Sequence, residues 1–401
     1  MKILWVNANF LHPTTKGGQI RTLEMLKRLH DRHEVHYAAF ADDAEPEGPA
    51  RAGEYSTKSY PVKRTLPKRG SPAFFGQVAA GAFSQVPVAV GRFYSPEMEK
   101  LVARLQATER FDCMVCDFLV SAVHFPKLEE AVLFQHNVES MIWKRHAEHA
   151  PDAMRRWFFS VQAKRMLRYE EQCCRRAGYV IAVSPLDAQM MRDMYGVGHV
   201  SDISTGVDLD YFAPRASDQK RHDLVFVGSM DWMPNIDGVQ YFVREVLPLI
   251  RAKRPECSLA VVGRKPDSSI QALAAADPQI TITGTVPDVR PYLWNSALSL
   301  VPLRIGGGTR LKVYESMAAR TPVVSTTIGA EGLVWEDGMN IAIGDTPESF
   351  ADRCLALLED RDARARMAEN GWSLVSSRFS WEQVTRQFEE LMLRSKTARV
   401  A

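Results

Sequence analysis

The sequence predicts two doubly wound α/β domains of the Rossmann-like type, and three observations lead to this fold class. The chain has 401 residues, of which 46% are hydrophobic and 24% charged, as expected of a globular protein with about two or three domains. Short apolar runs alternate with amphipathic helical patterns in both halves, as in parallel sheets covered by helices. Residues 203–214 interrupt this alternation with turn residues, so we place a linker there.

The first half begins with a β-α-β unit. An apolar run at residues 2–6 precedes a loop at 7–18, and the helix predicted at 19–30 has leucines at helical spacing. A strand at 34–40 completes the unit, whereas residues 42–95 lack a periodic pattern and are expected to hold surface insertions. The remaining elements are a helix at 96–108, strands at 111–118 and 131–135, a long helix at 151–177, a strand at 179–184 and a helix at 185–196.

The alternation resumes after the linker, which predicts the second domain. Its elements are a strand at 222–229, a helix at 235–251, strands at 258–263 and 280–284, a short helix at 289–296, a strand at 298–303, a helix at 309–320 and a strand at 322–327. A final amphipathic helix at 380–395 could pack against either domain.

Charge and cysteine content exclude several classes of function. Fifty Lys and Arg residues balance 48 Asp and Glu residues, which argues against a nucleic-acid partner. Cys113 and Cys116 lie inside an apolar strand pattern, so the six cysteines suggest neither a disulfide framework nor a zinc site. The first residues form too short an apolar run for a signal peptide, and no run approaches a membrane span. We therefore expect a cytoplasmic protein.

The most informative segment is VPLRIGGGTRLKVYESMAAR at residues 301–320. Three consecutive glycines follow its strand: Gly306, Gly307 and Gly308. Glycines let a ligand approach the backbone closely, and the helix that begins near Thr309 has free N–H groups in its first turn. The strand, the glycines and the helix together form a pattern typical of an anion site.

Charged residues strengthen this interpretation. Arg310 and Lys312 place two cations in the first turn, where they oppose the helix dipole unless an anion binds there. The carboxylate of Glu315, one turn further along, could accept hydrogen bonds from two ribose hydroxyls. The segment therefore predicts a diphosphate site, and the alternative is an ordinary β-α turn with solvated basic residues.

The same segment resembles the donor-site signature of the GT-B glycosyltransferases of family 4, which transfer a sugar from a nucleoside diphosphate sugar with retention of configuration. The resemblance extends to a glycine-containing loop at 16–19, a histidine loop QHNVES at 135–140, a linker TGVDLDYF at 205–212 and a GTV element at 284–286. It implies a GT-B fold, in which two Rossmann-like domains face a central cleft. Residues 1–205 would bind the acceptor and 206–379 the nucleotide sugar, with a helix at 380–401 packing back onto the first domain.

The resemblance also implies roles for individual residues. His136 would contact the transferred sugar near the reacting carbon, and Gly17 and Gly18 would admit the donor phosphate or the acceptor. Arg310 and Lys312 would join His136 in catalysis by stabilising the leaving diphosphate. The other expected donor-binding positions are Gly228, Val286, Gly306, Gly307, Gly308, Thr309, Leu311 and Glu315.

The sequence departs from the family pattern at two places. Many members carry two glutamates eight positions apart, but Gly307 stands where the first would be, and only Glu315 matches. The loop at 228–235 lacks the Arg and Lys pair that many relatives use on the diphosphate, a role that Arg310 and Lys312 could take over. A sugar-nucleotide epimerase of the same fold and a catalytically silent nucleotide-sugar-binding protein are therefore the alternatives.

We expect no metal and no other cofactor. Asp208 and Asp210 imitate a metal-binding Asp-x-Asp motif but lie in the predicted linker. The sequence has no G-x-G-x-x-G after its first strand, no Walker lysine loop and no G-x-S-x-G elbow. The expected donor is a UDP- or GDP-linked sugar, and the expected acceptor is a glycan or a lipid-linked molecule in polysaccharide, glycolipid or cell-envelope glycan biosynthesis.

Two basic stretches in the N-terminal domain leave open whether this domain contacts a membrane. Residues 61–92 and the predicted helix at 151–177 combine several Lys and Arg residues with aromatic residues. Such stretches are either solvated faces or surfaces that touch anionic headgroups weakly. We therefore expect a cytoplasmic protein that is either free or peripheral at the inner face of the membrane.

Overall fold

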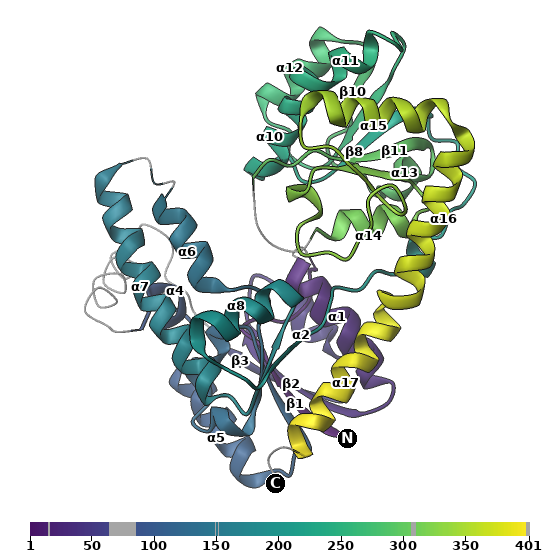
Figure 1. Cartoon of the computed structure of the whole chain (residues 1–401). Helices are drawn as coiled ribbons and strands as arrows, with labels where there is room; N and C mark the ends of the chain where they lie inside the picture. The colour runs from purple at the N-terminus through teal and green to yellow at the C-terminus, as the bar shows by residue number, and fades with distance from the viewer. Residues whose placement is uncertain (15–16, 64–85, 149, 151, 306–309, 398–401) are drawn as a thin grey trace. The chain divides into compact units, whose positions relative to one another are not determined.

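The computed structural model describes residues 1–14, 17–63, 86–148, 150, 152–305 and 310–397 (Figure 1). The chain divides into two compact units. Unit 1 consists of Met1–Ser204 and Val384–Ala401, and unit 2 of Thr205–Gln383. Each unit contains one parallel sheet, of seven and six strands respectively, which confirms the predicted fold class.

The sheet of unit 1 has the strand order β3-β2-β1-β4-β5-β6-β7. Its strands are β1 (Lys2–Val6), β2 (Glu34–Ala41), β3 (Lys58–Lys63), β4 (Cys113–Asp117), β5 (Val132–Phe134), β6 (Tyr179–Ala182) and β7 (Val200–Asp202). The chain progresses outward from the β1–β4 pair in both directions, which makes this pair a topological switch point. Ligands of doubly wound sheets bind at the carboxyl ends of such strands.

The helices of unit 1 enclose this sheet. They are α1 (Gly17–His30), α2 (Glu47–Ala50), α4 (Val88–Gly91), α5 (Pro96–Thr108), α6 (Glu139–Glu148), α7 (Ala153–Arg176) and α8 (Pro185–Tyr195), with 3-10 turns at Ala52–Glu54, Leu119–His124 and Leu128–Glu130. The last helix, α17 (Trp381–Thr397), reaches the core through Phe388, whose ring lies 5.4 Å from that of Trp5 and 5.0 Å from that of Phe134.

Unit 2 has the strand order β10-β9-β8-β11-β12-β13, with its switch point between β8 and β11. The strands are β8 (His222–Val227), β9 (Leu259–Val262), β10 (Ile280–Ile282), β11 (Ser296–Val301), β12 (Val323–Ser325) and β13 (Ala342–Ile343). The helices are α9 (Leu209–Phe212), α10 (Met233–Tyr241), α11 (Leu247–Arg251), α12 (Ser268–Ala276), α13 (Arg290–Trp294), α14 (Leu311–Ala318), α15 (Pro347–Glu359) and α16 (Arg361–Arg378), with a 3-10 turn at Ile328–Ala330.

Several predicted boundaries are wrong for identifiable physical reasons. The helix predicted at 235–251 is interrupted by a π turn at Phe242–Val246, where Pro248 removes a backbone donor. The region expected to be irregular contains β3, an edge strand in which only Val62 is buried. The predicted linker contains α9, and Asp208 caps this helix by accepting a hydrogen bond from the backbone N–H of Tyr211.

Candidate functional site

The switch point of unit 1 is organised around Asp117, the last residue of β4, which is fully buried. Its Oδ2 atom accepts hydrogen bonds from Trp5 Nε1 (2.9 Å), Asn7 Nδ2 (2.6 Å) and Thr22 Oγ1 (2.8 Å). Its Oδ1 atom lies 2.7 Å from Nε2 of His136. Four donors from three separate segments therefore satisfy this buried carboxyl group.

His136 follows β5 and is buried. Burial lowers the pKa of its imidazole, and the negative charge of Asp117 only partly opposes this shift. A neutral ring that donates from Nε2 to a carboxylate leaves Nδ1 as an acceptor. Within the described part of the chain, Nδ1 has no hydrogen-bond partner. The structure thus holds an imidazole in one orientation with a free lone pair.

Gly18 lies directly beside this lone pair. A Cβ atom added at Gly18 would lie 2.6 Å from Cζ of Phe118 and 3.5 Å from Nδ1 of His136. The Phe118 ring stacks on the imidazole with centroids 3.8 Å apart, and its backbone has a φ of 66°, which is strained for a residue other than glycine. Gly17 and Gly18 form the first turn of α1, so the predicted loop ends earlier than residue 18.

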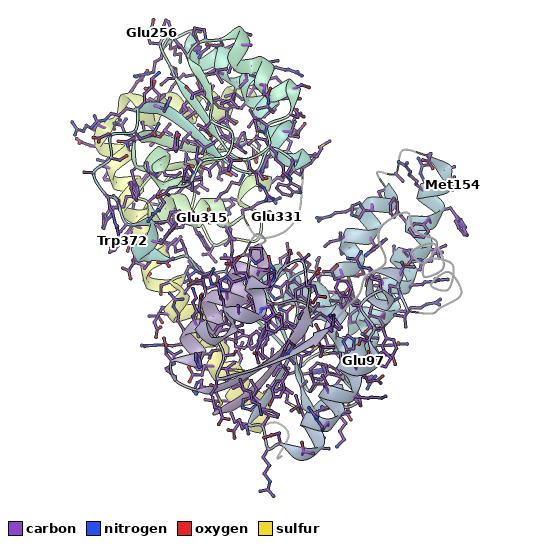
Figure 2. The ribbon with its side chains drawn as sticks, turned by 180° about the vertical axis from the view of Figure 1, so that it is seen from behind. Glu97, Met154, Glu256, Glu315, Glu331 and Trp372 are labelled. Atoms are coloured by element: carbon purple, nitrogen blue, oxygen red, sulfur yellow. The ribbon has the colours of Figure 1, made fainter. Side chains whose placement is uncertain are left out.

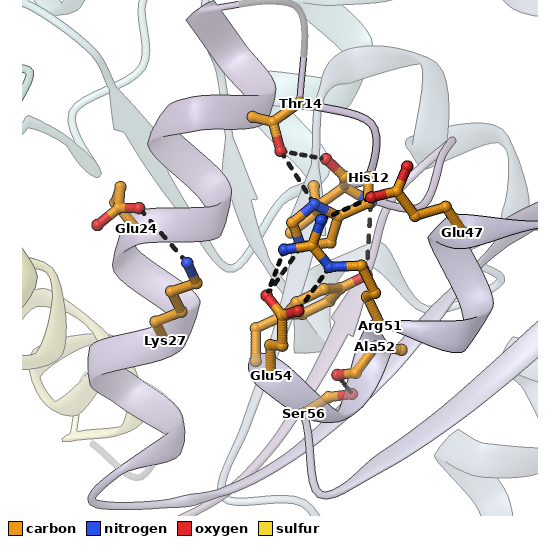
Figure 3. Close-up of polar contacts among 11 residues, drawn as sticks. His12, Thr14, Glu24, Lys27, Glu47, Arg51, Ala52, Glu54 and Ser56 are labelled. Atoms are coloured by element: carbon orange, nitrogen blue, oxygen red, sulfur yellow. Dashed lines mark hydrogen bonds and ion pairs between the residues drawn. The ribbon is translucent and has the colours of Figure 1, made fainter. Parts of the chain in front are cut away.

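The loop before α1 is held by polar side chains (Figure 3). Nε2 of His12 lies 3.1 Å from Glu54 Oε2, and Arg51 binds the carboxylates of both Glu54 and Glu47 at 2.6 Å. Oγ1 of Thr14 donates to the carbonyl of Leu11 at 2.8 Å. These contacts fix the chain just before residues 15 and 16, which lie outside the described part.

In unit 2, the side chains of Phe226, Asn235 and Lys312 lie together at the carboxyl end of β8. A Cβ atom at Gly228 would lie 2.7 Å from Asn235 Nδ2 and 2.8 Å from Lys312 Nζ. The ammonium of Lys312 donates to Asn235 Oδ1 at 2.9 Å and lies 4.3 Å from the centroid of the Phe226 ring. Only glycine at position 228 leaves room for this arrangement beside the backbone.

Arg310 stands at the N-cap of α14, one position before the helix begins at Leu311. It is buried, with 3% of its surface exposed, and its Nε lies 3.4 Å from the carbonyl oxygen of Ile328. Its guanidinium lies 5.9 Å from the ring of Trp232. Arg310 is therefore not the solvated basic residue of an ordinary β-α turn, which was the alternative to a diphosphate site.

Burial shifts the ionisation of two neighbours on α14. The pKa of Lys312 falls to about 7, because burial and the positive charge of Arg310 both disfavour the ammonium. The pKa of Glu315, labelled in Figure 2, rises to about 7 because burial disfavours its carboxylate, although Lys312 opposes this. A bound anion would stabilise the charged form of Lys312 and offset its desolvation.

The other predicted positions are less closely grouped. Val286 lies beyond β10, which β9 separates from β8, and it packs against the core of unit 2 after a turn at Gly284 with a φ of 67°. Leu311 is the first residue of α14 and is partly exposed. Gly306, Gly307, Gly308 and Thr309 lie outside the described residues.

Sequence reasoning missed the two residues that position the predicted ones. Asp117 is the last residue of an apolar run. Asn235 follows a proline in the segment 228–235, where the sequence shows only that the family's Arg and Lys pair is missing. Their partners are 19 and 77 positions away in the chain. The only available signal was that Asp117 ends a strand and that Asn235 lies in the first turn of the helix after one, at the two switch points.

Across the described residues, no three His, Cys, Asp or Glu side chains gather as metal ligands would. No helix within the same ranges has both the length and the apolar character needed to cross a bilayer.

The family models, together with the fold, give the class of the protein. The chain superimposes on Anabaena HepE, whose crystal structure contains UDP, with a TM-score of 0.69 and 16% sequence identity over 98% of this chain and 100% of that one. The family model for Glycosyltransferase Family 4 matches residues 15–211, and that for Glycosyl transferases group 1 matches residues 221–360. The chain therefore belongs to the group 1, family 4 glycosyltransferases of GT-B fold, as predicted.

Curated relatives match shorter segments of the chain at higher identity. D-inositol 3-phosphate glycosyltransferase 2 of Catenulispora acidiphila is 26% identical over 253 residues, which cover 56% of this chain and 58% of that protein. Lipopolysaccharide core biosynthesis glycosyltransferase LpsE of Rhizobium meliloti is 36% identical over 85 residues, which cover 20% of this chain and 24% of that protein. The matching segments thus span little more than half of these relatives at most.

Proposed function

We propose that this protein is a retaining glycosyltransferase that moves a sugar from a UDP- or GDP-linked donor to an acceptor hydroxyl. Unit 2 would bind the donor and unit 1 the acceptor. The convergence of Lys312, Asn235 and Gly228 at the β8–β11 switch point carries the proposal, because it places a cation where doubly wound sheets bind phosphates. Family membership and the UDP complex of HepE support it.

The donor's diphosphate would lie between Lys312 and Arg310. Negative charge grows on this group as the bond to the sugar breaks, and each fixed positive donor would stabilise it by about 3 kcal/mol, by analogy with oxyanion holes. Both side chains are held before the donor arrives, by Asn235 and by the carbonyl of Ile328. Glu315 would accept the ribose hydroxyls.

In unit 1, Nδ1 of His136 would accept a hydrogen bond from a hydroxyl of the transferred sugar near the reacting carbon. Asp117 is a positioning residue, because it holds the imidazole through Nε2. Its two oxygens already accept four hydrogen bonds, which argues against its use as a nucleophile. We therefore propose attack from the face of the leaving group, with a phosphate oxygen of the donor taking the acceptor's proton.

Two fixed cations supply the charge that a divalent metal supplies in other glycosyltransferases, so we propose a metal-independent transfer. Activity that survives prolonged treatment with EDTA would support this part of the proposal. Activity that is lost with EDTA and restored by Mg²⁺ or Mn²⁺ would contradict it.

The test is incubation of the protein with a panel of UDP- and GDP-sugars, with and without candidate acceptors, followed by measurement of free nucleoside diphosphate and of sugar isomers. Release that requires an acceptor is expected. Isomer formation would indicate a sugar-nucleotide epimerase. Binding without turnover would indicate a catalytically silent nucleotide-sugar-binding protein, the alternative suggested by Gly307 in place of the family's first glutamate.

A matched pair of variants tests the assignment of Lys312. Lys312→Met should lower turnover at least about 100-fold, since it removes a charge-assisted hydrogen bond to the leaving group. Lys253→Met, which removes an exposed lysine from the same unit, should leave turnover unchanged. Full activity of Lys312→Met would remove the phosphate assignment.

A further inference from the structure

A groove of about 820 Å³ lies in unit 1 among α6, α7 and α8. Helices α6 and α7 form an antiparallel pair that projects from the rest of the unit (Figure 1). The predicted helix at 151–177 corresponds to α7, whereas α6 was not anticipated, because only Ser140 of its ten residues is buried. The groove plays no part in the proposed reaction and therefore needs its own explanation.

The sequence itself makes this space hollow. Ser140, Lys144 and Ala147 recur at helical spacing on α6, and Ser160, Ala163 and Leu167 recur in the same way on α7. Helices normally fill the space between them with large interlocking side chains. Serine or alanine at four of these six positions leaves the groove open along about 16 Å of α7, from Arg156 to Leu167, at 1.5 Å per residue.

The lining has a strongly apolar inner part and a cationic outer part. Towards α8, it is formed by Leu167, Met190 and Met194, of which Leu167 and Met194 are exposed. Methionine adapts to irregular apolar ligands because its side chain is flexible and polarisable. A concave apolar surface of this kind suits an apolar ligand.

The outer part is formed by Lys144, Arg156 and Lys164, with Glu148 as the one acidic lining residue. Throughout the described ranges, none of these three cations lies within 4.0 Å of a carboxylate oxygen. Cations on long apolar stems can cover an apolar chain while they hold an anionic group at the surface. The charge of the lining thus selects an anionic partner.

Two exposed apolar residues flank Arg156, a lining residue of the outer part, in the sequence. Met154 and Trp157, on the first turns of α7 beside Arg156, are 78% and 68% exposed. Figure 2 shows Met154 at the tip of the helix pair, directed away from the rest of unit 1. Tryptophan next to basic residues is typical of surfaces that sit at the boundary between lipid and water.

We propose that this groove binds the apolar chain of one anionic membrane lipid, whose phosphate is held by Lys144, Arg156 and Lys164. The chain occupies the methionine-lined inner part, and Met154 and Trp157 enter the interface of the bilayer. Unit 1 thereby docks on a membrane through a captured lipid rather than through a diffuse basic face. The inference goes beyond sugar transfer and does not depend on it.

Calorimetric titration with dodecyl phosphate below its critical micelle concentration tests single-lipid binding. Dodecyl maltoside lacks the charge and butyl phosphate lacks the chain, so both should bind at least about tenfold more weakly. Ala163→Trp fills the groove without changing charge and should weaken dodecyl phosphate binding to the same extent. Equal binding of all three probes, or unchanged binding by Ala163→Trp, would overturn the proposal.

Sedimentation with vesicles of phosphatidylglycerol and phosphatidylcholine tests docking. Lys164→Gln and Arg168→Gln each remove one positive charge from α7, but only Lys164 lines the groove. Lys164→Gln should reduce vesicle binding several-fold more than Arg168→Gln. This comparison tests the groove even if Ala163→Trp fails to fold. Equal losses would show a diffuse electrostatic surface, and an unbound wild type would show no docking surface; either result refutes the proposal. UDP binding, measured in parallel, should be unchanged in all variants, so that a failure of the proposed function is recognised separately.

Discussion

Nε2 of His136 lies 2.7 Å from Oδ1 of Asp117, and this pair determines which nitrogen of the imidazole faces Gly18. Because the carboxylate accepts the N–H of Nε2, the lone pair is at Nδ1. Burial lowers the pKa of the imidazole, so the ring is neutral at neutral pH. The pair thus presents a hydrogen-bond acceptor, not a cation, at the switch point of unit 1.

Asp117→Asn should reverse the tautomer of His136 without removing the contact. The amide oxygen would still accept from Trp5, Asn7 and Thr22, while the amide N–H₂ would face Nε2 and force the ring proton onto Nδ1. Loss of one acceptor for the sugar hydroxyl should lower kcat/KM by about 10- to 100-fold. Steady-state kinetics, with the Kd of UDP measured separately and expected to be unchanged, provide the check.

Thr22→Val is the matched control for this variant. It removes one of the donors to Asp117 but leaves the bond to His136 in place. Its effect on kcat/KM should be several times smaller than that of Asp117→Asn. Equal effects in the two variants would mean that the network acts through local stability rather than through the orientation of His136.

The layout of the sheets could be predicted because buried parallel strands are continuous apolar runs. The runs at 2–6 and 111–118 and the three glycines at 306–308 are visible in the sequence without knowledge of the fold. Strand ends are therefore located well, and with them the edges where ligands bind. Helix α6 was missed because its exposed positions are mostly polar and give no apolar stripe.

Partners across the sheet could not be predicted, since spacing along the chain does not reveal them. Asn7 and Asp117 meet because β1 and β4 are neighbours, although 110 positions separate them. Lys312 and Asn235 meet because β8 and β11 pair. Such contacts depend on strand order, and a single sequence does not specify which strands become neighbours.

Gly228→Ala should weaken nucleotide binding at a moderate cost in stability. The added methyl group would lie 2.8 Å from Nζ of Lys312 and 2.7 Å from Nδ2 of Asn235, so the flexible lysine and the buried asparagine must both shift. We expect the Kd of UDP to rise about tenfold while the free energy of unfolding falls by about 1–2 kcal/mol. Titration calorimetry and urea unfolding measure the two quantities.

Gly53→Ala is the control for that substitution, because no atom lies within 4 Å of the added Cβ and the helical turn there tolerates alanine. Its UDP affinity should equal that of the wild type. A normal Kd in Gly228→Ala would show that the donor does not use the position of Lys312 seen in the structure.

The affinity for UDP should fall as pH rises through the pKa of Lys312. In the free protein this pKa is about 7, so binding a diphosphate above pH 7 requires the uptake of a proton. The pKa of Glu315 is also about 7, but its carboxylate is ionised above that pH in both states and adds no slope. The Kd should therefore rise by up to about tenfold per unit between about pH 8 and about pH 9.

Calorimetry in buffers of different ionisation enthalpy measures that proton directly. Wild type and Glu315→Gln should both take up close to one proton per UDP at about pH 8, whereas Lys312→Met should take up none. Proton uptake that persists in Lys312→Met would assign the titration to another group.

Glu170→Gln should destabilise unit 1 and loosen the loop that carries His136. The buried Glu170 carboxylate accepts the backbone N–H groups of Glu139 (2.9 Å) and Ser140 (2.9 Å), the hydroxyl of Tyr195 (2.6 Å) and the amide of Gln135 (3.2 Å). It therefore holds the chain on both sides of His136. An amide at this position turns an N–H₂ group towards some of these donors and should cost about 1–3 kcal/mol.

Thermal unfolding should show this cost as a decrease in Tm of several degrees for the transition of unit 1, at about 2–4 °C per kcal/mol. The neighbouring Glu171→Gln removes only a partly exposed ion pair with Arg175 and should change the free energy of unfolding by less than about 0.5 kcal/mol. If Glu170 also positions His136, its variant should lose kcat at a temperature where it is fully folded, with the Kd of UDP unchanged. A loop free to move could not hold Nδ1 of His136 in place for the sugar. A variant that loses stability but keeps kcat would therefore show that Glu170 has only a structural role.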